Sequence, residues 1–331
     1  MRVLVTGSSG FVGRALIPVL LRQGHQPAEA VRRAPEKPDG RLTTVVVGNI
    51  DGTTGWSKAL QSAEAVIHLA ARVHIMRDSA DDPLAEFRRV NTEGTLHLAR
   101  QAAEAGVRRL IFLSTIGVHG NSTLHGKAFT PADTPSPHDP YSLSKYKAEI
   151  GLRSIAQSTG MEAVIIRPPL VYGGNAPGNF GKLTRLVAKG LPFPLGSINN
   201  LRSFVGIDNL VDFIVTCLEH PAAANETFLV SDGEDLSTPD LIRRMARAMN
   251  HPERLLPVPT FVLKAAAAML GRCGMAQRLC GSLQVDISKS RQLLGWNPPF
   301  SVDEGLRRAV GGGWSPRLRD ALTRGLEIGD W

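Results

Sequence analysis

The sequence predicts an α/β fold, in which a doubly wound parallel sheet is followed by a smaller, mostly helical domain. Three observations lead to this prediction. Short apolar runs alternate with helical patterns over the first half of the chain, a glycine-rich turn follows the first run, and the alternation weakens after Arg167. Strands that alternate with helices form right-handed βαβ units, which give a parallel sheet.

Six short apolar runs in the first half predict the strands. They cover residues 3–5, 28–31, 45–47, 66–69, 110–113 and 164–166. Helical spacing of apolar residues predicts helices over residues 11–23, 84–105 and 141–158. Each helix is followed by a glycine, Gly24, Gly106 or Gly160, at the position where a left-handed residue commonly ends a helix.

Prolines and glycines interrupt the pattern between residues 168 and 178. Because such residues break strands and helices, we expect residues 1–168 to form the sheet domain and residues 169–331 the smaller domain. Residues 202–219 have the pattern of a strand and a helix, and we expect residues 203–225 to return to the sheet domain. The remainder should be helical except for one strand at residues 227–230.

The composition limits the classes of partner. The chain has 331 residues, 43% of them hydrophobic and 21% charged, which is ordinary for a globular protein. Its net charge of +8 favours anionic partners: nucleotides, phosphorylated sugars, nucleic acid or an acidic membrane surface. The basic residues are scattered, and only 5% of the residues are aromatic. A nucleic-acid-binding function is therefore not expected.

Cysteines and apolar stretches favour a cytoplasmic protein without a metal site. Cys217, Cys273 and Cys280 form no Cys-x-x-Cys pair, and the chain opens on a strand-like run instead of a signal peptide. Residues 258–270 are too few to span a bilayer and include Lys264. For the apolar residues 255–283, packing in the core of the smaller domain is favoured over a face for a membrane or a partner.

The turn after the first strand has glycine at three positions, in the spacing Gly-x-x-Gly-x-x-Gly. Gly7 allows a sharp turn, Gly10 lets a pyrophosphate approach the backbone, and Gly13 lets helix and strand pack closely. The N-terminus of the following helix then faces the phosphates with free N–H groups. The motif predicts a Rossmann-type dinucleotide site, with contacts from Gly7, Ser9, Gly10, Phe11, Val12 and Gly13.

Tyr141 and Lys145 form the second motif. Residues four apart lie on one face of a helix, so the two side chains can act together. A free tyrosine titrates near pH 10 and is a poor base at neutral pH, and a neighbouring ammonium is expected to lower its pKa. The pair therefore predicts a general acid/base for a redox reaction.

Together these motifs resemble the extended short-chain dehydrogenase/reductase family, which includes NAD-dependent nucleotide-sugar epimerases, dehydratases and reductases. The resemblance covers nearly the whole chain. Further matching segments are His68-Leu69-Ala70-Ala71, residues 91–95, residues 113–120, Arg167-Pro168, residues 202–205 and residues 294–298.

The resemblance implies roles for individual residues. Thr115 takes the place of the serine or threonine that holds the reacting oxygen, Lys145 also binds the nicotinamide ribose, and Asn91 is a structural or proton-relay residue near the active site. Asn179 and Arg202 lie where family members contact the nucleotide diphosphate of the substrate. Further cofactor contacts are expected at Arg32, Arg33, Asn49, Ile50, Leu69, Ala70, Ala71, Ser114, Tyr141, Lys145 and Pro168.

Three positions depart from the family pattern. His119 replaces the usual tyrosine of Val-Tyr-Gly, which puts substrate contacts there in doubt. Asn49 stands where an aspartate often holds the adenine amino group. A late arginine segment that many relatives use on the substrate phosphates is not evident near residues 281–283, although Arg278 could substitute for it.

The second strand predicts which cofactor is preferred. In the NAD pattern, an acidic residue at its end bonds the ribose 2′-hydroxyl. Here the strand ends in Arg32 and Arg33, and guanidinium groups suit a 2′-phosphate. The sequence therefore favours NADP(H) over NAD(H), although both arginines could simply point to water.

The expected reaction is oxidation or reduction at C4 of a nucleotide sugar, with UDP the favoured nucleotide. We favour reduction of a UDP-4-keto-6-deoxy-N-acetylhexosamine for a polysaccharide such as lipopolysaccharide O-antigen. The alternatives are a UDP-glucose or UDP-N-acetylglucosamine 4-epimerase, a redox enzyme on a non-sugar carbonyl, and a catalytically silent NAD(P)-binding protein. The resemblance also implies a homodimer through the helices at residues 84–105 and 141–158.

Overall fold

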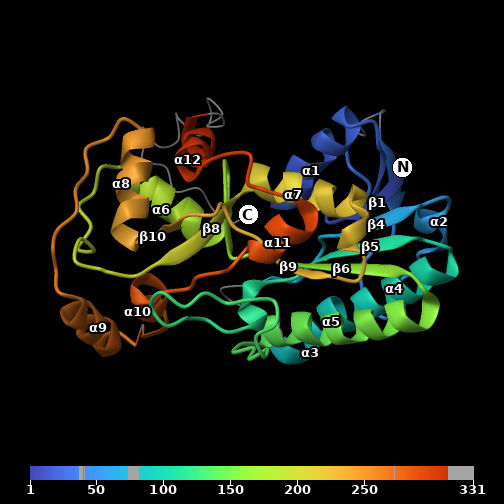
Figure 1. The fold of residues 1–331 in the computed structure, drawn as a ribbon, viewed down its shortest axis with the longest axis horizontal. Coiled ribbons are helices and arrows are strands. Elements are labelled where there is room, and N and C mark those ends of the chain that lie inside the picture. The colour runs from blue at the N-terminus through green and yellow to red at the C-terminus, as the bar shows by residue number, and fades with distance from the viewer. Residues whose placement is uncertain (37–39, 41, 74–81, 272, 312–331) are drawn as a thin grey trace.

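The main sheet of the computed structural model has seven parallel strands; the structure describes residues 1–36, 40, 42–73, 82–271 and 273–311 (Figure 1). The strands are β1 (Arg2–Thr6), β2 (Gln26–Val31), β3 (Thr43–Val46), β4 (Ala65–His68), β5 (Arg109–Leu113), β6 (Glu162–Arg167) and β9 (Thr227–Leu229). Their spatial order is β3-β2-β1-β4-β5-β6-β9, with parallel pairing throughout. The predicted doubly wound α/β fold is confirmed.

Helices cover both faces of this sheet (Figure 1). On one face lie α1 (Phe11–Arg22) and α7 (Ile207–Glu219), whose buried apolar residues share a core with β1 and β6. On the other lie α2 (Ser57–Leu60), α4 (Thr95–Glu104) and α5 (Pro140–Thr159). Such two-sided burial explains why the strands read as continuous apolar runs.

The helix predicted at residues 84–105 is divided into three parts. A short α3 (Pro83–Phe87) passes into a π-helical stretch, η1 (Arg88–Gly94), and then into α4. A π-helical stretch inserts an extra residue into a turn and is frequent at functional sites. Here it carries Asn91. The Arg72 backbone nitrogen donates to the side-chain oxygen of Asn91, and the side-chain nitrogen of Asn91 donates to the Arg72 carbonyl oxygen.

A second sheet of three strands lies beside the first. Its order is β10 (Asp235–Leu236), β8 (Arg202–Gly206), β7 (Leu170–Tyr172). Residues 202–219 therefore divide between the sheets, because β8 pairs with β7 and β10 while α7 packs on the main sheet. The strand expected at residues 227–230 is β9, which extends the main sheet at its edge, where Phe228 and Leu229 are buried. The division at residues 168 and 169 stays a proposal.

The second sheet packs against α6 (Gly178–Ala188), α8 (Thr238–Ala248) and α12 (Val302–Gly311) in a core of its own. The remaining helices are η2 (Ile116–Val118), η3 (Pro221–Ala223), α9 (Thr260–Met269), α10 (Cys273–Cys280) and α11 (Ser288–Leu294). The preference for core packing of residues 255–283 is wrong for α9, which has no buried residue.

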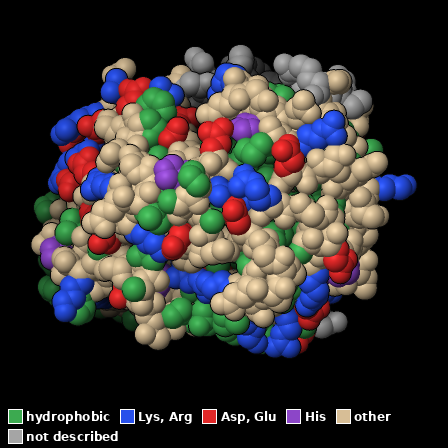
Figure 2. Space-filling model, turned by 45° about the vertical axis from the view of Figure 1, so that its right-hand side comes forward, with side chains coloured by type: hydrophobic (Ala, Val, Ile, Leu, Met, Phe, Trp, Pro, Cys, Tyr) green, Lys and Arg blue, Asp and Glu red, His purple; other side chains and the backbone are tan. Residues whose placement is uncertain are grey.

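The surface matches the scattered charge of the sequence. On the face that Figure 2 shows, basic and acidic side chains lie intermixed over most of the area. Within the described ranges, no helix combines the length and the apolar character that a bilayer span requires.

Candidate active site

The turn between β1 and α1 needs glycine at two positions. Gly7 has a φ of +71°, and a Cβ there would lie 2.7 Å from the backbone nitrogen of Ala70. A Cβ on Gly13 would lie 2.3 Å from the carbonyl oxygen of Gly7. No other residue fits at either position unless the backbone shifts. Gly10 is less confined, since its Cβ would lie 3.1 Å from that same oxygen.

The amino end of α1 fits an anionic group. Its N-cap residue is Gly10, no side chain caps the first turn, and that turn holds no acidic residue. Uncapped N–H groups and the positive end of the helix dipole suit a dinucleotide pyrophosphate. Contacts of Ser9, Phe11 and Val12 with such a cofactor remain predictions.

Helix α5 carries the predicted catalytic pair on its first two turns. Asp139 caps it by accepting a hydrogen bond from the Ser142 backbone nitrogen at 2.7 Å, and Pro140 occupies its first position. Both features favour a helix start at this place. Tyr141 is partly buried and meets the edge of the Phe87 ring, with 6.1 Å between ring centroids.

The Lys145 side chain is almost completely buried. Its ammonium donates to the Leu113 carbonyl oxygen at 2.8 Å and lies 4.2 Å from the centroid of the Phe112 ring. Burial lowers the pKa of Lys145 to about 7, and the Glu149 carboxylate opposes that shift. Burial therefore favours the neutral amine of Lys145 more than water favours it for a free lysine.

The expectation that Lys145 lowers the pKa of Tyr141 is not met. Burial raises the pKa of Tyr141 above its ordinary value, and the negative charge of Asp139 raises it further. The reason is that Lys145 is itself desolvated, and its ammonium is directed at the Leu113 carbonyl. A phenolate at Tyr141 thus needs stabilisation from a bound molecule.

Asn91 is buried and joins η1 to helix α5. Its amide nitrogen donates to the Ser144 hydroxyl at 3.0 Å, and that hydroxyl donates to the Tyr141 carbonyl at 2.7 Å. The neighbouring Thr92 hydroxyl donates to the Ser144 carbonyl at 2.8 Å. These bonds fix the first turn of α5, so Asn91 positions the backbone that carries Tyr141.

Sequence reasoning missed a buried ion pair behind the catalytic face. Glu149 accepts hydrogen bonds from Arg167 at 3.0 and 2.5 Å, and from the Ser114 hydroxyl at 2.5 Å. All three residues are buried. Glu149 follows Lys145 by four residues and therefore shares its helix face. This spacing of four residues was the signal in the sequence that could have drawn attention to Glu149.

Thr115 and His119 follow the end of β5. The Thr115 hydroxyl oxygen accepts a hydrogen bond from the Gly117 nitrogen at 3.1 Å and so caps η2. His119 is buried, accepts from Arg167 at 2.6 Å through Nε2, and stacks on Phe129. Burial and the charge of Arg167 lower its pKa to about 4. His119 therefore belongs to the buried network of Glu149 and Arg167.

His68 belongs to a second buried chain of polar groups. Its Nδ1 lies 2.7 Å from the Thr6 hydroxyl, which also accepts from the Ala70 nitrogen at 3.2 Å. Its Nε2 lies 2.9 Å from the Thr95 hydroxyl, which donates to the Asn91 carbonyl at 2.8 Å. Burial and the charge of Lys145 lower the pKa of His68 to about 3. The chain connects the glycine-rich turn to Asn91.

Several expected cofactor residues lie near the ends of neighbouring strands. Arg32 and Arg33 are exposed just after β2, and Asn49 is exposed beyond β3. Ile50 packs on η1, where its Cγ2 atom would lie 2.8 Å from a Cβ on Gly94. Leu69, Ala70, Ala71, Ser114 and Pro168 follow β4, β5 and β6 directly. The sheet order places β4 next to β1 and its glycine-rich turn, and β5 one strand further along the sheet.

The residues expected to bind substrate lie in what we call the second unit. It consists of the three-stranded sheet with α6, α8 and α12. Asn179 is exposed on the first turn of α6. The Arg202 guanidinium donates to the carbonyl oxygens of Arg278 and Gly281 at 3.1 and 3.0 Å. Burial and the positive charge of Arg278 lower the pKa of Arg202. The fold thus brings Arg278 beside Arg202. This position is compatible with the suggestion that Arg278 replaces the late arginine segment of its relatives.

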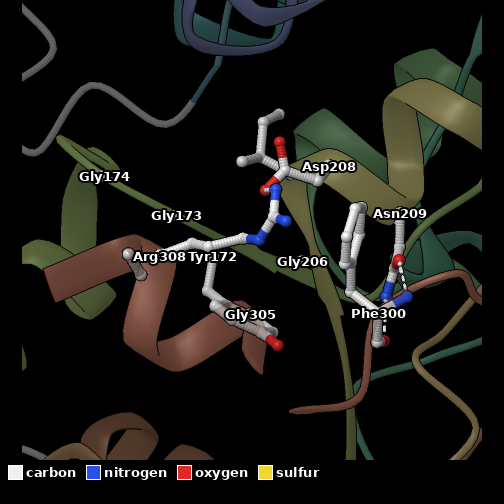
Figure 3. Close-up of a pocket in the computed structure, with 11 residues that line it drawn as sticks. Tyr172, Gly173, Gly174, Gly206, Asp208, Asn209, Phe300, Gly305 and Arg308 are labelled. Carbon is white, nitrogen blue, oxygen red and sulfur yellow. Dashed lines mark hydrogen bonds and ion pairs between the residues drawn. The ribbon is translucent and has the colours of Figure 1, made fainter. Parts of the chain in front are cut away.

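A separate cavity of about 180 Å³ lies between β7, the start of α7 and α12 (Figure 3). Arg308 extends across it and lies 3.6 Å from Asp208 and 3.8 Å from the Phe300 ring centroid. The Tyr172 hydroxyl donates to Asp232 at 2.7 Å. Because these polar groups are bonded to one another, the cavity is assigned no function.

Known proteins resemble this chain over nearly its whole length. Residues 3–231 match the NAD dependent epimerase/dehydratase family. The chain is 47% identical to a UDP-glucose 4-epimerase of Vibrio cholerae, over 93% of this chain and 94% of that protein. It is 26% identical to an N-acetyl-alpha-D-glucosaminyl-diphospho-ditrans,octacis-undecaprenol 4-epimerase of Escherichia coli, with 93% and 94% covered.

The solved structures agree in fold. A UDP-N-acetylglucosamine 4-epimerase from Bacillus cereus superposes with a TM-score of 0.77 at 19% identity, over 94% of this chain and 98% of that one. At this identity the likeness concerns the fold alone. The family match and the 47% identical relative carry the assignment: the chain is an enzyme that belongs to the NAD-dependent epimerase/dehydratase family.

Proposed function

We propose that this enzyme interconverts C4 epimers of a UDP-linked hexose through a 4-keto intermediate. The observation that carries the proposal is the 47% identity with a UDP-glucose 4-epimerase over almost the whole chain. The presence of Tyr141 and Lys145 four residues apart on α5 supports the redox chemistry. The sequence favoured a net reductase and held the epimerase as its alternative; the similarity to that relative now favours the epimerase.

The protein's own residues handle the proton in this proposal. Tyr141 takes the proton of the C4 hydroxyl when C4 is oxidised and returns it when the ketone is reduced. Lys145 in its ammonium form stabilises the phenolate. Thr115 accepts from the Gly117 nitrogen, so its own proton remains able to donate to the C4 oxygen. NAD, when bound, supplies the hydride acceptor at C4 and a positive charge that favours the phenolate.

The substrate diphosphate is proposed to bind at Arg202, with Arg278 beside it and Asn179 on α6. Arg202 is fixed by two backbone carbonyl oxygens, and its pKa is lowered by burial and by Arg278. A bound diphosphate would relieve the repulsion between the guanidinium groups, and arginine suits phosphate recognition. A cytoplasmic location and a homodimer through α4 and α5 belong to the same proposal.

Net reduction of a UDP-4-keto-6-deoxy-N-acetylhexosamine, as a step of O-antigen synthesis, is the second candidate. The observation that favours it is the end of β2, where exposed Arg32 and Arg33 stand in place of a carboxylate. An NADP(H) preference would suit an enzyme that takes up a reduced cofactor, transfers one hydride and releases it. An epimerase returns its hydride to the same sugar and retains NAD.

One experiment separates the two candidates. The purified protein is denatured and the released nucleotide identified, and the native protein is incubated with UDP-glucose and UDP-N-acetylglucosamine without added cofactor. Retained NAD and epimer formation would support the epimerase. Turnover only with a 4-keto sugar and added NADPH would support the reductase, and failure of both assays would favour a silent binding protein. N-acetylglucosaminyl-diphospho-undecaprenol is tested as a further substrate, because the relative from Escherichia coli is named as a 4-epimerase of that compound.

A further inference from the structure

Helix α9 exposes apolar side chains that no described part of the chain covers. None of its residues is buried, and Phe261 and Met269 are 74% and 88% exposed. Leu270, directly after the helix, is 71% exposed. Figure 1 shows α9 at one end of the molecule, and α10 is its main packing partner among the described elements. Exposed apolar groups of this size on one element commonly mark an interaction site.

Both ends of this α9–α10 hairpin (residues 255–281) are attached to the second unit. Before α9, the Leu256 nitrogen donates to Phe193 at 2.8 Å, and the Gly196 nitrogen donates to Leu256 at 2.9 Å. After α10, the Asn200 amide donates to the carbonyl oxygens of Leu279 and Gly281. The hairpin is therefore anchored to the protein at its base, while none of the residues that the structure describes buries a side chain of α9.

The charge of the hairpin has one sign. No aspartate or glutamate occurs from residue 255 to residue 281, whereas Lys264, Arg272 and Arg278 are basic, and Arg254 directly precedes the hairpin. Arg254 and Lys264 are exposed. This pattern differs from the intermixed charges of the face in Figure 2. Cations around an apolar surface complement the anionic lipids of a bilayer.

We propose that the α9–α10 hairpin docks this enzyme on the surface of an anionic phospholipid bilayer. Phe261, Met269 and Leu270 enter the boundary between headgroups and acyl chains, and Lys264 contacts the lipid phosphates. The ten residues of α9 measure about 15 Å, which is half of a hydrocarbon core, so the helix lies in the interface. A second copy of the chain fits less well, because a symmetric contact would oppose two basic surfaces without an acidic partner.

The test is flotation of the purified full-length protein with vesicles, one set of phosphatidylcholine alone and one with about 30% phosphatidylglycerol. We expect binding to the anionic vesicles that weakens at about 0.5 M salt. The double substitution Phe261→Asp and Met269→Asp, and separately Lys264→Glu, should each reduce binding roughly ten-fold or more. Val46→Asp is the matched control, because Val46 is 55% exposed on β3 of the other sheet, and it should bind as the unaltered protein does.

Three outcomes would overturn the proposal: no flotation of the unaltered protein with anionic vesicles, equal loss in the Val46 control, or flotation that the hairpin substitutions leave unchanged. Light scattering of the same variants separates the rival occupant. If the double substitution turns a dimer into a monomer and leaves vesicle binding intact, a second copy covers the hairpin instead. Circular dichroism of each variant verifies that it is folded.

Discussion

Helices α5 and α9 place polar and apolar residues in opposite ways. Helix α5 buries a lysine, a glutamate and two serines, and side-chain hydrogen bonds hold Lys145, Glu149 and Ser144. Helix α9 has the more apolar sequence and buries none of it. Helix α5 is enclosed by α4, η1 and the sheet, whereas α9 has α10 as its main neighbour. Burial of a side chain here depends on the elements that surround its helix, and not on the polarity of the helix alone.

The largest effect is expected at the buried chemistry of α5. Tyr141→Phe removes the acid/base hydroxyl and should lower turnover by about 10²–10⁴-fold, while cofactor binding changes by a few-fold. Steady-state rates and cofactor titration measure the two effects. Tyr146→Phe, five residues further along the same helix, is the control and should keep most activity. Near-normal turnover of Tyr141→Phe on the true substrate would refute the assignment.

The ion pair behind the site should carry a large share of stability. Glu149→Gln leaves the buried guanidinium of Arg167 without its counter-charge, which should cost about 3–5 kcal/mol of unfolding free energy. Chemical denaturation measures it. The exposed pair of Glu234 and Arg244 offers the comparison, since Glu234→Gln should cost at most about 1 kcal/mol. Equal costs at the two positions would show that burial of Glu149 adds nothing.

Lys145 predicts a dependence of stability on pH. Its pKa is about 7 in the folded protein, below the value of 10.5 for a free lysine, so the unfolded chain binds more protons between these values. The contribution of Lys145 to stability therefore rises as the pH rises from 7 towards 10. Lys145→Met abolishes that rise, so its melting temperature should fall relative to the unaltered protein over this range. A constant difference between Lys145→Met and the unaltered protein across this range would contradict the prediction.

The smallest effect is expected on α9. Phe261→Ala should change the unfolding free energy by no more than about 0.5 kcal/mol, because the ring is exposed. Leu152→Ala on α5 removes a fully buried side chain and should cost about 2–5 kcal/mol. Thermal or chemical unfolding of both variants gives the comparison. A cost above about 2 kcal/mol for Phe261→Ala would mean that α9 is covered in solution.

Sequence patterns predicted the parts of the molecule that depend on local geometry. The spacing of Gly7 and Gly13 was informative because backbone contacts there exclude any Cβ. The spacing of Tyr141 and Lys145 predicted a shared helix, which is α5, but not the burial that raises the pKa of Tyr141. The parallel sheet followed from the alternation of strands and helices.

Contacts between distant segments could not be predicted in this way. The pairing of β9 with β6 joins residues about sixty positions apart, and short strands give no signal of their neighbour. The buried ion pair joins Glu149 to Arg167 on different elements. The exposure of α9 was also beyond reach, because an apolar run reads alike in a core and on a surface.

The buried chain of hydrogen bonds from Ala70 through His68 to Asn91 can run from donor to acceptor in only one direction. The Ala70 amide can only donate and the Asn91 carbonyl can only accept, and each threonine hydroxyl has one proton. Thr6 must therefore give its proton to Nδ1 of His68, and Nε2 must carry the proton given to Thr95. His68 is confined to a single neutral tautomer. The glycine-rich turn and Asn91 are thus joined by one ordered series of hydrogen-bond donors, in which no member reverses alone.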